Sequence, residues 1–127
     1  LLTNPPPMPA FAQSDKTHAI ALEHFLDRQA SLDALVWKYM ADSPYQQYLK
    51  NANRELGQNI VAALVFGDIH LIQANLEWIQ GLLVNYHFRM PNNVLKAYFE
   101  KYRQAARESL DERGAVILNW LDEFKGV

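Results

Sequence analysis

The chain contains no cysteine among its 127 residues. This absence excludes disulfide bonds, thiolate metal sites, cysteine nucleophiles and thioether attachment of haem or bilin. No run approaches the roughly 18 consecutive apolar residues that a membrane-spanning helix needs, and the first residues lack the charged and apolar regions of a signal peptide. We therefore expect a cytoplasmic chain that does not enter a membrane.

An excess of charge of one sign is also missing. The 12 Lys and Arg residues and 14 Asp and Glu residues give a formal net charge of -2. Both signs are spread along the chain, so no basic arm or acidic tail is present. Such a chain does not attract phosphate backbones or anionic lipid by its net field, and we expect no nucleic-acid partner.

Motifs for catalysis are absent from the sequence as well. It has no glycine-rich phosphate loop and no glycine-flanked serine of the nucleophile-elbow type. A diiron bundle would need a Glu with a His three residues later, and no Glu of this chain has one. We predict no metal site, and an undescribed enzyme is only the second alternative function.

Hydrophobic residues make up half of the chain, which suits one domain of ordinary size. Prolines at positions 5, 6, 7 and 9 cannot join the interior of a helix and favour extended backbone. We interpret residues 1–12 as a proline-rich lead-in or linker, and residues 13–127 as a single helical domain.

The first helix is predicted to begin at a cap formed by Ser14 or Asp15. Its apolar side first carries His18, Leu22, Phe25, Leu26 and Gln29. Past Asp27 the apolar direction turns by roughly 60°. The second apolar set consists of Leu32, Leu35, Val36, Tyr39 and Met40. This change of direction predicts a kink or break near residues 28–31.

A start signal for the next helix is formed by Ser43 as a cap and Pro44 at the first helical position. This helix is predicted to run from Pro44 to Phe66. Gly67 can end it in a left-handed conformation, while Asp68 caps the helix that follows. So short a link predicts that the two helices are antiparallel neighbours.

The segment Ile69–Tyr86 is predicted to be the central helix, because apolar residues cover half of its circumference. Asn92 or Asn93 caps the last long segment. Its inward positions are Val94, Leu95, Tyr98, Phe99, Tyr102, Ala105, Ala106 and Leu110. Apolar residues continue at nearly the same angle past Gly114, so one long helix and a helix broken there both remain open. Strand signals are absent. The predicted fold class is all-α: an antiparallel bundle of four long helices, with a globin-like arrangement of the same helices as the alternative.

Two asparagines interrupt apolar faces. Asn75 lies in the apolar half of the central segment, and Asn59 lies on the inward side of the preceding helix. Both are eight residues from Gly67, which places them at one level of the hairpin, roughly 12 Å from the turn. A buried amide without a partner costs about 1 to 3 kcal/mol. We therefore predict a buried polar pair that either locks the register of the hairpin or binds a shared small-molecule ligand.

A histidine lies at the end of the central segment. His87 follows Tyr86, and the next helix brings Tyr98 and Tyr102. An apolar, aromatic pocket with one histidine is what haem ligation needs, and the size and all-helical layout invite comparison with short globin-like sensors. The first alternative function is thus a sensor of haem or a similar apolar cofactor, with these four residues at the site and His87 as the ligand.

Two tryptophans lie off the main apolar stripes. Trp37 lies away from the apolar face of its helix, and Trp78 lies at the edge of the central apolar arc. Large aromatics in such positions mark either a second contact surface or covered bundle ends. We favour a non-catalytic regulatory or protein-interaction module of a signalling protein, which dimerises or docks on a protein partner through an apolar and aromatic helix face. This function needs no cofactor.

Overall fold

The computed structural model describes residues 9–72 and 90–123, and every regular element in these ranges is a helix or a 3-10 turn. In chain order the elements are α1 (Pro9–Tyr39), α2 (Gln46–Phe66), the 3-10 turn η1 (Ile69–Leu71), α4 (Asn92–Ser109), the 3-10 turn η3 (Glu112–Gly114) and α5 (Ala115–Glu123). Neither of the two described stretches contains a strand. The predicted all-α class is therefore confirmed.

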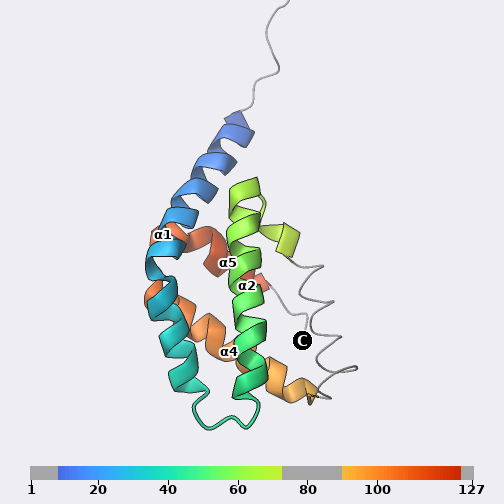
Figure 1. The fold of residues 1–127 in the computed structure, drawn as a ribbon. Coiled ribbons are helices and arrows are strands. Elements are labelled where there is room, and N and C mark those ends of the chain that lie inside the picture. The colour runs from blue at the N-terminus through green and yellow to red at the C-terminus, as the bar shows by residue number, and fades with distance from the viewer. Residues whose placement is uncertain (1–8, 73–89, 124–127) are drawn as a thin grey trace, which may run out of the picture.

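α1 and α2 form an antiparallel hairpin, and α4 and α5 lie across its back (Figure 1). α1 descends from the top of this view, the chain turns at the bottom, and α2 returns beside it. α4 crosses behind the hairpin obliquely instead of running alongside it. α1 is the central element of the described part, because it packs against α2, α4, η3 and α5.

α1 runs as one helix from Pro9 to Tyr39, so the break that the sequence offered near residues 28–31 is wrong. The axis of α1 does bend part-way along its length (Figure 1). Leu26, which the prediction placed on the apolar side, is 55% exposed. The buried positions of α1 are His18, Ala21, His24, Phe25, Leu32 and Val36. The helix also begins inside the predicted lead-in, because proline is tolerated in the first turn of a helix.

α2 begins at Gln46, two residues later than predicted. The hydroxyl oxygen of Ser43 accepts a hydrogen bond from the backbone N–H of Tyr45 at 3.2 Å, so its capping contact falls in the turn before the helix. The end of α2 agrees with the prediction. Gly67 adopts a left-handed conformation with φ of 76°, and its N–H donates to the carbonyl of Leu64 at 3.1 Å.

Asp68 caps η1 as the sequence predicted, because its Oδ1 accepts a hydrogen bond from the backbone N–H of His70 at 3.0 Å. The predicted central helix therefore opens as a 3-10 turn. The greater part of that segment, residues 73–86, lies outside the described residues.

The last long segment is broken, and the break precedes Gly114. α4 ends at Ser109, and Leu110 is extended, with φ of -106° and ψ of 149°. Asp111 then accepts a hydrogen bond from the backbone N–H of Arg113 at 2.9 Å and opens η3. Of the two possibilities that the sequence left open, the broken helix is correct, and an aspartate cap sets the position of the break.

The core lies where α1, α2 and α4 meet, and it extends to α5. Its largest fully buried side chains include Trp120, Tyr98, Tyr102, Phe25, Leu32, Leu49, Leu56 and Ile60. The predicted inward face of α4 is confirmed at Leu95, Tyr98, Phe99, Tyr102, Ala105 and Ala106, all of them buried.

Candidate functional site

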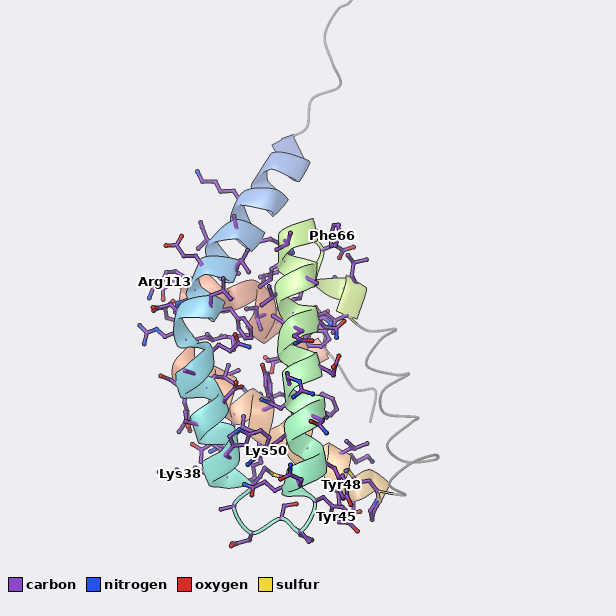
Figure 2. All side chains as sticks on the ribbon, in the orientation of Figure 1. Lys38, Tyr45, Tyr48, Lys50, Phe66 and Arg113 are labelled. Carbon is purple, nitrogen blue, oxygen red and sulfur yellow. The ribbon has the colours of Figure 1, made fainter. Side chains whose placement is uncertain are left out.

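Apolar side chains stand exposed at the C-terminal end of α2. Ala63 and Leu64 are buried there, and each further helical residue turns by about 100°, so the next two positions face outward. Val65 is 64% exposed and Phe66 is 76% exposed. Figure 2 places Phe66 at the upper end of the helix. Phenylalanine is among the residues most often fully buried, so its exposure here calls for an explanation.

η1 extends this apolar group. Ile69 is buried, whereas Leu71 is 52% exposed. The backbone N–H of Ile69 donates to Nε2 of the buried His18 at 3.3 Å, which fixes the turn against α1. Because η1 packs directly against α2, we define Val65, Phe66 and Leu71 as the α2-end patch.

Polar side chains border the α2-end patch. Nε2 of His70 in η1 lies 3.3 Å from Oε2 of Glu123 at the end of α5. Nδ1 of the same ring lies 3.7 Å from Oδ1 of Asp68. All three side chains are exposed. An apolar centre with a polar rim is the usual composition of a protein interaction surface.

A chain of polar side chains crosses the core and joins three helices. Tyr98 of α4 donates its hydroxyl to Oδ1 of Asn53 of α2 at 2.6 Å. The amide nitrogen of Asn53 in turn donates to Oδ1 of Asp33 of α1 at 2.9 Å. Asn53 and Tyr98 are buried, so this chain satisfies polar groups that have left water.

Burial controls the ionisation of this polar chain. It raises the pKa of Asp33, and the hydrogen bond from Asn53 partly offsets that rise. Burial also raises the pKa of Tyr98 and of Tyr102 well above the ordinary value, with the charge of Asp33 as a smaller contribution. Both phenols therefore stay neutral, and Tyr98 acts as a permanent donor. The arrangement connects α1, α2 and α4.

The buried amide of α2 is Asn53, whereas the sequence argument selected Asn59. Asn59 is partly buried, and its Nδ2 donates to the backbone carbonyl of Glu55 on the same helix at 2.7 Å. Asn75 lies outside the described residues, so the pair of Asn59 and Asn75 stays a prediction. The sequence did contain a signal for Asn53, because it follows Leu49 by four residues on the inward stripe.

The haem hypothesis rests partly on residues that are not described. His87 and Tyr86 lie in the segment 73–89, outside the described residues. Tyr98 and Tyr102 are buried side by side in α4, with ring centroids 6.1 Å apart. The haem site made of these four residues therefore stays a prediction.

The two tryptophans offered as interface candidates are placed as follows. Trp37 is half-buried and packs against the core, and Trp78 lies outside the described residues. The strongly exposed aromatic residue is instead Phe66, which the sequence argument passed over. A signal was available, because Phe66 directly precedes Gly67 and lies off the inward stripe of its helix, as Trp37 does.

Two buried histidines hold segments that are far apart in the sequence. His18 accepts the N–H of Ile69, as described above, and Nε2 of His24 accepts the backbone N–H of Asp111 at 3.1 Å. The sequence predicted His18 on the apolar side of the first helix, and it is buried there. Both lie on α1, and each fixes the start of a 3-10 turn.

Comparison with protein-family models, curated proteins and solved structures gave no match. Within the described residues, no helix is long and apolar enough to cross a membrane. The same residues contain no group of three or more His, Asp or Glu side chains placed to hold a metal ion. The expected cytoplasmic location stays a prediction.

Proposed function

We propose that this chain is a non-catalytic interaction module that docks on a protein partner through the α2-end patch. The observation that supports this most directly is Phe66, which is 76% exposed beside the exposed Val65 and Leu71. Burying a side chain of this kind contributes about 1.5 to 3 kcal/mol. Protein interfaces commonly depend on a few such aromatic or apolar anchors.

The setting of the patch also favours docking. The left-handed Gly67 and the bond from Ile69 to His18 hold the patch residues on a fixed turn. A surface that is already ordered loses little conformational entropy on binding. The charged rim can orient a partner without adding much affinity. A second copy of this chain is the first partner that we consider, and a regulatory role in signalling is part of the same proposal.

Sedimentation analysis over a range of protein concentrations tests self-association. The double variant Phe66→Ser with Leu71→Ser removes most of the α2-end patch. Leu26→Ser is the matched control, because Leu26 is an exposed apolar residue on α1. We expect the mass of the wild type and of the control to rise with concentration, while the double variant stays monomeric. All three should unfold at similar temperatures, because the substituted side chains are exposed.

If the wild type stays monomeric at every concentration, the partner is a different protein. A photoreactive phenylalanine analogue at position 66 should then cross-link a defined set of proteins in cells. The same group at Lys38, at the opposite end of the hairpin (Figure 2), should not. Equal labelling from the two positions would contradict docking through the α2-end patch.

A further inference from the structure

His24 lies at the contact between α1 and the corner that joins α4 to α5. Its side chain is 1% exposed. Nε2 of the ring lies 3.1 Å from the backbone nitrogen of Asp111 and 3.3 Å from Oδ1 of the same residue. One ring nitrogen therefore faces two groups of Asp111 at nearly the same distance.

These two contacts require opposite protonation states of the ring. The backbone N–H can donate only to a nitrogen that carries a lone pair, whereas the carboxylate can accept only from a nitrogen that carries a proton. A neutral ring with its proton on Nδ1 satisfies the first contact and opposes the second. A protonated ring satisfies the second contact and opposes the first.

We propose that His24 is a proton-operated connector, which holds the corner at Asp111 by the backbone N–H when its ring is neutral and by the carboxylate when its ring is protonated. This inference does not depend on the proposed docking function. The exchange needs no large movement, because both groups already lie beside the same nitrogen. The connection between α1 and the corner would therefore persist when the ring gains a proton.

The carboxylate of Asp111 stays ionised, and its Oδ1 already accepts hydrogen bonds from the backbone N–H and Nε of Arg113 at 2.9 and 3.0 Å. Hydrogen bonds from the side chain and backbone of Arg113 hold the pKa of Asp111 well below its usual range. The carboxylate thus remains ionised wherever histidine changes charge. Nδ1 of His24 is buried and has no hydrogen-bond partner among the described residues, so Asp111 is the polar group that responds to the protonation state of the ring.

Other charged groups around His24 come from its own helix and from the corner. Glu23 and Asp27 of α1 line a surface pocket of about 240 Å³ together with His24 and Arg113. Arg28, one turn after His24 on α1, has its Nε 3.4 Å from Oδ2 of Asp27. Nη2 of Arg113 lies 2.7 Å from Oδ2 of Asp111.

The remaining neighbouring elements carry charges that have other partners or are exposed. In the last turn of α4, Arg107 pairs with Asp122 of α5 at 2.9 Å, and Glu108 accepts a hydrogen bond from the hydroxyl of Tyr39. The first turn of α5 contains no charged residue, and Glu112 of η3 is exposed. Asp111 is the charged residue in direct contact with Nε2 of His24.

A double-mutant cycle on the pH dependence of stability tests the proposal. Asp111→Asn removes the charge but keeps an oxygen that can cap the turn. His24→Gln keeps an acceptor for the backbone N–H but cannot gain a proton. Urea unfolding of the wild type, both single variants and the double variant is measured from about pH 8 to about pH 5.5.

In Asp111→Asn the protonated ring faces a neutral amide oxygen where the wild type has a carboxylate. We expect this variant to lose roughly tenfold more of its folded-to-unfolded ratio across the range than the wild type does, since a hydrogen bond to a charged group contributes about that much. The extra loss should vanish in the His24→Gln background. The other histidines are unchanged in all four proteins, so their contributions cancel in the cycle. Parallel profiles of Asp111→Asn and the wild type would overturn the proposal.

A measurement on the wild type keeps the proposal falsifiable if a variant fails to fold. Nitrogen NMR of the imidazole rings distinguishes the two neutral tautomers. We expect His24 to carry its proton on Nδ1 at about pH 8, and the amide proton of Asp111 to shift as the ring becomes protonated. A proton on Nε2 at the higher pH would contradict the proposal directly.

Discussion

The side-chain amide of Asn53 forms hydrogen bonds with two neighbouring helices. Its oxygen accepts from Tyr98 of α4, and its nitrogen donates to Asp33 of α1. A hydrophobic residue here could pack against either helix at more than one level. The amide has both of its hydrogen-bond partners at only one position of α2 along its axis. Asn53 therefore specifies the register of α2 relative to α1 and α4.

Tyr98→Phe tests this connection with the loss of one hydroxyl. The buried oxygen of Asn53 would lose its donor, and we expect the free energy of unfolding to fall by about 1 to 3 kcal/mol in urea titrations. Tyr39→Phe is the matched control, because the hydroxyl of Tyr39 donates to Glu108 at an exposed position. The control should stay within about 0.5 kcal/mol of the wild type. Equal losses in the two variants would count against the role of Asn53.

At the scale of elements, the end of α2 follows from local chemistry. Gly67 and Asp68 end α2 and open η1 as the sequence predicted, because a left-handed glycine and an aspartate cap act within a few residues. The prediction for α1 misplaced one side chain, Leu26, which is exposed. Periodicity identifies an apolar stripe on a helix. It does not show whether a leucine at the edge of that stripe, such as Leu26, is covered by another helix.

The break between α4 and α5 depends on contacts that are far apart in the sequence. Asp111 is a recognisable cap, but the angular pattern of apolar residues continues beyond it and suggested one helix. His24 decides the matter, because it accepts the N–H that a continuous helix would have used internally. No local pattern could reveal that His24 reaches this position from α1.

Gly114→Ala probes this corner. A Cβ at position 114 would lie 3.1 Å from Cβ of Leu110 and 3.3 Å from Cδ2 of His24. Both neighbours are packed, so we expect thermal and urea unfolding to show a loss of about 1 to 3 kcal/mol.

Gly57→Ala is the matched control for that variant. Its Cβ would meet mainly the flexible end of Gln29, with Nε2 at 2.6 Å, and alanine in the middle of α2 gains about 1 kcal/mol of helix propensity. We expect a smaller loss than for Gly114→Ala. A larger loss for Gly57→Ala than for Gly114→Ala would show that the corner tolerates an added side chain. It would also show that the contact between α1 and α2 does not.

For the molecule as a whole, the sequence predicts which faces are buried better than it predicts what covers them. The inward residues of α4, such as Tyr98 and Tyr102, were identified from spacing alone. The oblique crossing of α4 behind the hairpin was not predicted, because the apolar stripe of a helix does not specify the angle at which another helix packs against it. The α2-end patch was missed for a similar reason: exposure at a helix end depends on where the next turn goes.

The pH dependence of global stability reports on Asp33. Burial raises the pKa of Asp33 above its value in the unfolded chain, so the folded state holds this proton more tightly. The stability that results is complete below about pH 4 and is lost as the pH rises through the pKa of the folded state. Ionised Asp33 therefore weakens the fold at neutral pH.

Asp33→Asn should remove this penalty while keeping an oxygen for the bond from Asn53. We expect the free energy of unfolding of the variant, relative to the wild type, to improve as the pH rises from about 3 to about 7. Chemical denaturation at several pH values measures the difference. Asp42→Asn, which removes an exposed carboxylate, should change it far less. A difference for Asp33→Asn that is the same at every pH would contradict the effect of burial.

The two buried histidines of α1 also bear on how the chain is made. Ile69, the partner of His18, follows it by 51 residues, and Asp111, the partner of His24, follows it by 87 residues. A ribosome completes α1 before either donor exists. We therefore expect α1 to act as a template during synthesis, on which η1 closes first and the corner after α4 closes later, in the order in which they are translated.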